Sequence, residues 1–315
     1  MTTIIAVCLI LFSCIAIIAH DFFWRFQQRL DLIPMLPRLQ GAIVLTFDDG
    51  PDSHLKAWGD QWEDIAQARE LIKAIDPGWD FQASITQNLA RTLQEFGVSA
   101  IFFVQGQVLA KDESTHPVLD DLAKRGHTIG NHFFSHTRYR EQAAKVTEKE
   151  IRATDNLIKK ITDRQTRLYR PPYGQWTILR SIRLRLNRRL SHYFLPLNWT
   201  HCSFDWDKPI ATLNRSNLEQ QVSDMLDDIE KRPGPAIILQ HDIWAYSALF
   251  TRLLLQRLQQ KSKLTVINPS VILQSNSEVG QGFWWLGLIR SYLQQRYRCI
   301  LSRATRQLAS PLQDY

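Results

Sequence analysis

Residues 42–51 read Ala-Ile-Val-Leu-Thr-Phe-Asp-Asp-Gly-Pro, an apolar run that ends in two adjacent carboxylates and a turn. Neighbouring side chains at the end of a strand point in different directions. Asp48 and Asp49 can therefore act separately, one binding a metal while the other takes a proton. Asp-Gly is also a common turn pair, so this motif alone leaves a simple solvated turn as an equal alternative.

A second segment, residues 126–136, carries two histidines four residues apart, His132 and His136. On a helical turn this spacing places both imidazoles on one face, where they can bind one ion. A lone histidine is more often structural, but imidazole is a preferred zinc ligand and the spaced pair favours a metal. Together with Asp49 the pair gives two imidazoles and one carboxylate, which leaves a coordination position open for water or substrate. This pattern predicts a catalytic metal site.

With three further segments, the chain resembles the polysaccharide deacetylases, carbohydrate esterase family four with its NodB-homology domain. The segments that carry the resemblance are residues 46–51, 132–136, 170–174 (Arg-Pro-Pro-Tyr-Gly), 205–206 (Asp-Trp) and 239–242 (Leu-Gln-His-Asp). They occur in the family's order, and five ordered motifs are far more specific than any one alone. The resemblance implies a distorted, incomplete (β/α) barrel and metal-dependent removal of N-acetyl groups from peptidoglycan or a chitin-like glycan.

The resemblance also implies which residues carry the chemistry. The metal ligands would be Asp49, His132 and His136. Asp48 would be the general base, with Arg170 paired to it and keeping it ionised. His241 would be the general acid that protonates the leaving amine, with Asp205 orienting and charging its imidazole. The backbone N–H of Tyr173 would help the metal to stabilise the oxyanion.

Trp206 and Leu239 would line the small pocket that receives the acetyl methyl group. Amide hydrolysis needs a nucleophilic water, an electrophile for the carbonyl oxygen and a proton for a poor leaving group. A metal-bound water, whose pKa falls to roughly 7, would attack the acetyl carbonyl. Zinc is the expected ion, with cobalt or nickel as substitutes. The alternatives are an O-acetyl glycan esterase of the same family and a catalytically silent glycan-binding or scaffold protein.

Two positions depart from the family's pattern. Phe133 stands where the family has Ser or Thr, which puts the rigidity of this loop in question more than metal binding. Cys202 stands where the family has Asp, and we expect weaker positioning of Arg170 or of the floor of the site. Ligation by Cys202 is disfavoured, because a buried free cysteine is usually a small hydrophobe.

The composition predicts one catalytic domain with terminal additions. At 315 residues and 44% apolar content, the chain can bury one sizeable core. Its four cysteines are too scattered to form a disulfide framework. The net charge of +7 is concentrated in arginines at residues 180–189 and in the tail from residue 282. No nucleic-acid motif accompanies them, so anionic lipid or an anionic wall polymer fits better, with a solvated helix face as the alternative.

The expected organisation is an N-terminal membrane anchor or signal-like segment at residues 1–24, a linker at 25–40, the catalytic domain at 41–275, and a linker with a basic aromatic tail at 276–315. Residues 4–19 are apolar apart from one serine and precede an aromatic cluster typical of a membrane interface. The tail has the composition of an interfacial helix, although packing on the barrel is an equal alternative. An acetylated polysaccharide and the membrane are the expected partners. The catalytic domain is expected to lie outside the cytoplasm, although the arginines after the anchor favour the opposite side.

Strand and helix patterns alternate from residue 41, which predicts a parallel sheet with the motifs at strand ends. Strands are expected at residues 42–47, 99–104, 167–170, 197–201, 236–240 and 264–267. Helices are expected at residues 85–96, 117–124, 143–161, 218–231 and 246–260. Residues 52–82 read as an insertion whose tryptophans, Trp58, Trp62 and Trp79, either stack on sugar rings or, with slight preference, dock on the barrel.

Overall fold

A computed structural model describes the central part of the chain. The described residues are 41–52, 65–138, 142–194, 196–207, 214–232, 234–260 and 264–273. They form a parallel sheet in the order β3-β2-β1-β5-β4, with β6 paired to β1. Its strands are β1 (Ala42–Asp48), β2 (Ile101–Val104), β3 (Thr128–Asn131), β4 (His201–Cys202), β5 (Ala236–His241) and β6 (Thr265–Val266).

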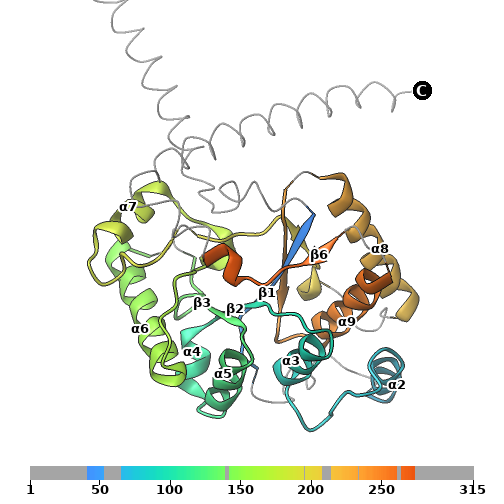
Figure 1. Ribbon diagram of the computed structural model, residues 1–315. Coiled ribbons are helices and arrows are strands. Elements are labelled where there is room, and N and C mark those ends of the chain that lie inside the picture. Colours follow the sequence, from blue (N-terminus) through green and yellow to red (C-terminus); the bar gives the residue numbers. More distant parts are fainter. Residues whose placement is uncertain are drawn as a thin grey trace, which may run out of the picture.

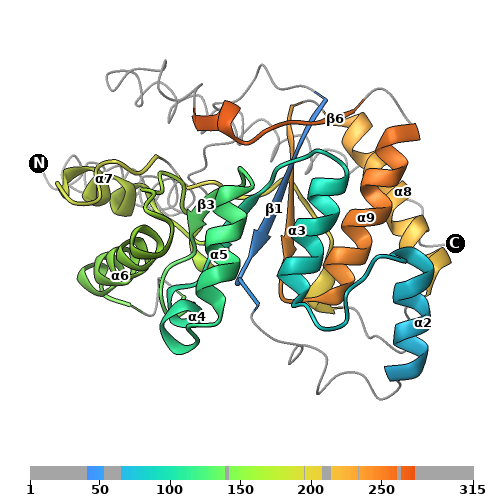
Figure 2. The same cartoon turned by 60° about the horizontal axis from the view of Figure 1, so that its bottom comes forward.

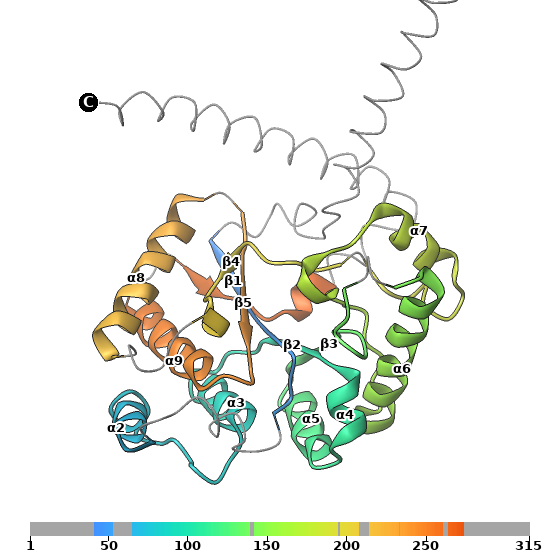
Figure 3. The ribbon, with the colours of Figure 1, turned by 180° about the vertical axis from the view of Figure 1, so that it is seen from behind.

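Helices cover the outside of the sheet. They are α2 (Ile65–Ile75), α3 (Ile85–Glu95), α4 (Gly106–Lys111), α5 (Thr115–Lys124), α6 (Ala144–Thr162), α7 (Ile178–Leu186), α8 (Arg215–Lys231) and α9 (Ala245–Gln260). The helices α4, α5 and α6 lie beside β2 and β3, whereas α3, α8 and α9 lie beside β1 and β5 (Figure 1). The same division is visible from below and from behind (Figures 2 and 3). This is an open, barrel-like α/β fold, as expected from the sequence.

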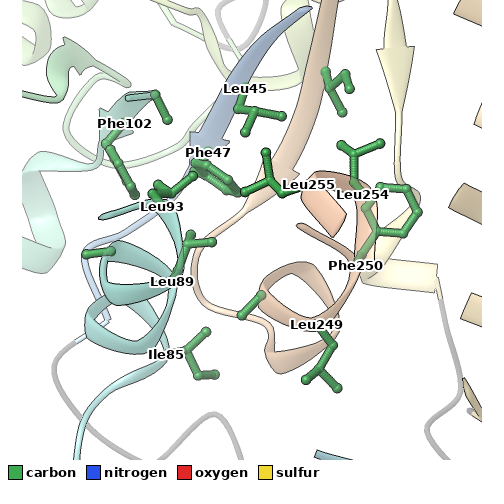
Figure 4. Close-up of a cluster of buried hydrophobic side chains, with 14 of the residues drawn as sticks. Leu45, Phe47, Ile85, Leu89, Leu93, Phe102, Leu249, Phe250, Leu254 and Leu255 are labelled. Carbon is green, nitrogen blue, oxygen red and sulfur yellow. The ribbon is translucent and has the colours of Figure 1, made fainter. Parts of the chain in front are cut away.

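The central strand β1 is buried on both faces, as is usual for a parallel strand covered by helices. Its alternate residues Ile43, Leu45 and Phe47 belong to the large core cluster that it shares with α3 and α9 (Figure 4). Val44 faces the opposite, smaller cluster inside the curve of the sheet. Because side chains alternate along a strand, Asp48 points to the same side as Val44. The polar end of the strand therefore opens at the carboxyl edge of this inner face.

Several helices begin and end close to the predicted positions because their boundaries carry local signals. The helix α3 starts with a capping box, in which the Ser84 hydroxyl accepts from the N–H of Gln87 and the Gln87 side chain accepts from the N–H of Ser84. The helix α8 starts at Asn214, whose side chain accepts from the N–H of Asn217. Both caps bind N–H groups of the first helical turn through nearby residues, so these helix starts can be recognised in the sequence.

Two strand expectations were wrong: residues 167–170 form no strand, and the strand expected at 197–201 is limited to His201–Cys202. Residues 167–170 contribute only a single bridge, between Tyr169 and Asn131. A strand instead forms at Thr128–Asn131, where none was predicted. This four-residue strand contains Gly130, and a Cβ at that position would lie 2.4 Å from Phe103 Cδ1. Close packing of β3 against β2, and not residue preference, therefore makes this segment a strand.

The segment at residues 52–82 contains α2, which the sequence pattern did not predict. Trp79 is buried in the large core cluster, so the docking interpretation holds for this tryptophan. Trp58 and Trp62 lie outside the described residues.

The expected anchor, first linker and tail, residues 1–24, 25–40 and 276–315, also lie outside the described residues. Within the described ranges, no helix has both the length and the apolar content that a membrane span requires.

Candidate active site

The carboxyl ends of β1 and β5 bring the first catalytic candidates together. Parallel pairing places Asp48 directly beside His241. The next residue, Asp49, has a left-handed backbone with φ 76°, and its N–H donates to the carbonyl of Phe103 at 3.2 Å. The chain therefore changes direction between the two carboxylates, which allows them to serve different neighbours.

The three predicted metal ligands converge. Asp49 Oδ1 lies 3.4 Å from His132 Nε2 and 3.3 Å from His136 Nε2. One ligand atom from each residue lies within 4.8 Å of the others. His132 Nδ1 makes a 2.8 Å hydrogen bond with the carbonyl oxygen of Arg170. Because a carbonyl can only accept, Nδ1 carries the proton and Nε2 is left with a lone pair that faces Asp49.

These residues fit a divalent cation. Asp49 Oδ1 is a buried acceptor with no hydrogen-bond donor among the described residues. Burial alone would raise the pKa of Asp49, but the nearby imidazoles, that of His132 first, lower that pKa below the ordinary value. Burial opposes protonation of His132, yet the charges of Asp48 and Asp49 raise its pKa. A cation bound here would satisfy the carboxylate directly and leave both imidazoles neutral, as metal ligands must be.

The expectation that the two histidines share a helical turn was wrong. Residues 132–136 form a loop after β3, and both Phe133 (φ 65°) and His136 (φ 56°) have left-handed backbones. The N–H of Phe133 donates to Asn131 Oδ1 at 2.8 Å, which tightens the turn. The loop brings the two imidazole rings to a centroid separation of 5.1 Å. Loop geometry, and not helical periodicity, builds the pair.

Phe133 supports this loop although it replaces a hydroxyl residue of the family's pattern. Its ring is buried and lies 5.5 Å from the ring of Trp176 and 6.3 Å from that of Tyr169. Tyr193 belongs to the same buried cluster, and its hydroxyl accepts from Asn131 Nδ2 at 2.9 Å. Aromatic packing therefore takes the place of the missing hydroxyl, and the loop keeps its support.

Arg170 is fully buried and holds the proposed base in place. Its Nη1 donates to Asp48 Oδ1 at 2.7 Å and to Thr46 Oγ1 at 2.8 Å. Its Nε donates to the carbonyl of Leu197 at 2.7 Å, and its Nη2 donates to that of Asn198 at 3.1 Å. A planar guanidinium with four fixed acceptors has one orientation, so the carboxylate paired with it is fixed as well.

The expectation that Cys202 weakens the positioning of Arg170 finds no support in these bonds. Cys202 Sγ accepts from the N–H of Phe204 at 3.3 Å. Burial raises the pKa of the Cys202 thiol to about 12, so the group is a neutral thiol. The cluster of candidate ligands among the described residues does not include it.

His241 and Asp205 form the second pair. His241 Nδ1 lies 2.9 Å from Asp205 Oδ1, and the His241 N–H donates to Asp205 Oδ2 at 2.7 Å. The Ser247 hydroxyl donates to the same carboxylate oxygen. Burial disfavours the charged imidazole, but the hydrogen bond and charge of Asp205, with the charges of Asp48 and Asp49, raise the pKa of His241 to about 9. His241 Nε2 faces the site, 3.9 Å from Asp49 Oδ2.

The remaining predicted residues surround this centre. The ring of Tyr173 is half exposed and lies 4.8 Å from the ring of His136, with a left-handed backbone at φ 60°. The ring of Trp206 stands perpendicular to that of His241 at 5.2 Å. Leu239 is buried two residues before His241 in β5, on the same face of the strand. All ten predicted residues are thus grouped at one edge of the sheet.

Sequence reasoning missed two buried side chains beside the site. Thr86 Oγ1 donates to Asp242 Oδ2 at 2.8 Å and accepts from the N–H of Asp52 at the same distance. A Cβ at Gly50 would lie 2.1 Å from Asp242 Oδ2, so the turn requires glycine there. Burial raises the pKa of Asp242 to about 7. Asp242 adjoins His241 in a recognised motif, whereas Thr86 lies in α3 and carries no local signal.

Comparison with known proteins agrees with this geometry. Residues 37–186 match the polysaccharide deacetylase family. The chain is 27% identical over 210 residues to a chitooligosaccharide deacetylase from Azorhizobium caulinodans, covering 64% of this chain and 74% of that protein. It is 26% identical over 186 residues to a peptidoglycan-N-acetylglucosamine deacetylase from Bacillus cereus, covering 58% of this chain but only 52% of that protein.

Solved structures share the fold. The peptidoglycan deacetylase PdaC from Bacillus subtilis superposes with a TM-score of 0.52 at 23% identity, covering 76% of this chain and 93% of that one. A family-four pseudoenzyme from Bacillus anthracis superposes with a TM-score of 0.53 at 15% identity, covering 75% of this chain and 66% of that one. At these identities the superpositions establish the fold alone. In sequence over residues 37–186, and in its fold, the chain is therefore similar to the polysaccharide deacetylase family.

Proposed function

We propose that this chain is a metal-dependent hydrolase that removes N-acetyl groups from an amino-sugar polysaccharide, either peptidoglycan or a chitin-like glycan. One observation carries the proposal. The cluster of Asp49, His132 and His136 lies next to two further catalytic candidates, Asp48 and His241, each held by its own buried partner. Relatives with the printed functions of chitooligosaccharide and peptidoglycan deacetylase support the choice of substrate class.

Asp49, His132 and His136 would hold one divalent ion. We propose zinc, because two imidazoles and a carboxylate suit it, although cobalt and nickel accept the same ligands. Such an ion, when bound, polarises a carbonyl oxygen and lowers the pKa of a water molecule.

Asp48 is the proposed general base. Its Oδ1 is occupied by Arg170, whereas its Oδ2 lies 3.8 Å from His132 Nε2, on the side of the ligand cluster. The base therefore presents a free oxygen to a water molecule in the site, in an orientation that the guanidinium fixes. That oxygen takes one proton from water as the new carbon–oxygen bond forms.

His241 is the proposed general acid. It is protonated at neutral pH because its pKa is raised to about 9, and its Nδ1 is held by Asp205. The proton on Nε2 passes to the amide nitrogen as the carbon–nitrogen bond breaks, which releases acetate and a free amine. The N–H of Tyr173 is proposed to stabilise the oxyanion beside the cation. Base and acid are thus separate groups, each held by its own buried partner.

Two alternatives follow from other observations. An O-acetyl glycan esterase would use the same residues, and nothing in their geometry depends on whether the leaving atom is nitrogen or oxygen. A silent glycan-binding protein is the second alternative, because one structural neighbour is described as a pseudoenzyme. The match to the Bacillus cereus relative covers only 52% of that protein, so the substrate is proposed here and is not taken over from that relative.

Acetate release tests these alternatives together. The purified full-length chain is assayed on N-acetylated and O-acetylated glycans, before and after treatment with a chelator, and again after zinc is restored. The proposal expects release from N-acetylated substrate that disappears with chelation and returns with zinc. Asp48→Asn serves as the matched inactive control. Release from O-acetylated substrate alone would establish the esterase, and bound metal without any release would favour the silent protein.

A further inference from the structure

Two exposed aromatic side chains lie beside the site and have no role in the scheme for acid and base. The large hydrophobic side chains exposed among the described residues are Val146, Tyr173, Leu186, Phe204 and Trp206. Phe204 and Trp206 are neighbours, with ring centroids 5.7 Å apart and exposed fractions of 55% and 49%. Exposed single apolar residues are common, but a pair beside a proposed active site is more informative.

The backbone forces Phe204 outward. Its neighbours Ser203 and Asp205 are both buried. The N–H of Ser203 donates to the carbonyl of Leu239 at 3.2 Å, and Asp205 is held by His241. Phe204 itself has φ 53°, a left-handed conformation that a bulky residue rarely adopts. Fixed residues on both sides therefore hold this ring in solvent at a cost in backbone strain, which is a feature of functional sites.

The ring pair of Phe204 and Trp206 lies next to His241, the proposed general acid. The ring of Trp206 stands at 89° to the ring of His241, with 5.2 Å between centroids. Phe204 lies beside Trp206, with 5.7 Å between their ring centroids. In the proposed reaction, His241 protonates the nitrogen of one sugar of a polymer. The rings of Trp206 and Phe204 extend outward from this imidazole, so we expect them to lie beside the adjoining sugar.

We propose that Phe204 is a stacking platform for the sugar residue next to the one that loses its acetyl group. This inference rests on the proposed function, and it adds a binding position that extends the substrate from a single sugar to an oligosaccharide. A pyranose ring presents a face of C–H groups, and the phenyl ring of Phe204 offers an apolar face with no polar atom that needs a partner. When the sugar face packs on the phenyl ring, both surfaces lose contact with water, which favours binding.

Glycine is the most informative replacement at this position. Phe204→Gly removes the ring and also relieves the left-handed strain, because glycine adopts φ 53° without steric cost. The variant should therefore fold at least as well as the parent, so that a loss of activity reports on the ring. Phe204→Tyr keeps the aromatic face and is the conservative control. Leu186→Ala, which removes an exposed apolar side chain from α7, is the control for surface hydrophobicity.

The test compares substrate lengths. The values of kcat/KM for acetate release are measured on N-acetylglucosamine and on chitin oligomers up to the pentasaccharide, using the zinc-loaded full-length chain. We expect the parent to prefer the longer substrates, and Phe204→Gly to lose at least about tenfold on them, mainly through KM, with little change on the monosaccharide. Phe204→Tyr and Leu186→Ala should behave like the parent. An equal effect at all lengths, or no effect at all, would overturn the platform while the deacetylase remains.

A binding measurement separates this inference from the proposed function. Calorimetric titration of the zinc-loaded Asp48→Asn chain with chitin pentasaccharide needs no turnover. Weaker binding after Phe204→Gly is added would support the platform even if the parent released no acetate, in which case the proposed function alone would fail. Unchanged binding, or no binding by the Asp48→Asn chain, would overturn the platform. The platform would also be overturned if Phe204→Gly converted a dimer into a monomer in sedimentation, because the ring would then serve self-association.

Discussion

Replacing Arg170 with methionine should destabilise the domain, because it leaves the buried carboxylate of Asp48 without its charge partner. Asp48 and Arg170 are buried together, and the guanidinium is the charge partner of this carboxylate. Removing one member of a buried pair leaves an uncompensated charge and costs about 3–5 kcal/mol. Domains of this size have unfolding free energies of about 5–15 kcal/mol, so Arg170→Met should still fold but with a large fraction of its stability lost.

The assay is urea denaturation of the full-length chain, followed by circular dichroism. Arg232→Met is the matched control, because Arg232, which follows the last residue of α8, forms an exposed ion pair with Asp228. An exposed pair contributes about 0–1 kcal/mol, so this control should stay close to the parent. The double variant Arg170→Met with Asp48→Asn removes both buried charges, and its loss should be smaller than the sum of the two single losses by about 0.5–3 kcal/mol.

One result would refute this reasoning. If Arg170→Met and Arg232→Met changed the unfolding free energy by the same small amount, the Arg170–Asp48 pair would not be a buried, mutually dependent unit. The fixed orientation of the Asp48 carboxylate would then need another explanation. The other hydrogen bonds described for Arg170 run to backbone carbonyls and to Thr46, and do not hold Asp48.

Three further predictions concern the chemistry. His136→Ala should lose both bound metal and acetate release, whereas His116→Ala on α5 should keep both. Bound metal is measured by elemental analysis of the dialysed protein. Retention of one equivalent of metal by His136→Ala would disprove the ligand assignment. Asp48→Asn and His241→Ala should keep the metal but lose turnover, with roughly 10² to 10⁴ lost in rate for the histidine, and loss of metal from both would make them ligands or structural groups. The protonated form of His241 donates and its pKa is raised to about 9, so activity should fall as pH rises through this value. Asp205→Asn should move that alkaline fall to lower pH in a kcat profile, and an unmoved fall would assign the titration to another group.

The sequence identified the strands that carry the site because their signals are local. The apolar run at residues 42–47 and the run at 236–240 each form a strand that extends one residue further than predicted, to Asp48 and His241. Both runs are buried and apolar apart from Thr46 and Gln240, close to the pattern of buried parallel strands, and each ends in polar residues. The ordered motifs then placed their side chains at one edge.

The parts that the sequence did not reveal depend on contacts between distant residues. The strand at Thr128–Asn131 exists because β2 pairs with it. Phe133 and His136 have left-handed backbones, but neither is a glycine or an asparagine, the residues that would indicate a turn in the sequence. The hydrogen bond from Thr86 to Asp242 joins residues 156 positions apart, and only the folded chain brings them together.

The central claim is that one ion, held by Asp49, His132 and His136, serves a base and an acid on either side of it. Titrating metal-stripped protein with zinc while measuring both bound metal and acetate release tests this claim most directly. We expect acetate release from an N-acetylated glycan to rise in proportion to bound zinc and to reach its maximum at about one equivalent, as for a single three-ligand site. Full acetate release from the stripped protein, or a maximum that persists when His132 and His136 are both replaced with alanine, would contradict it.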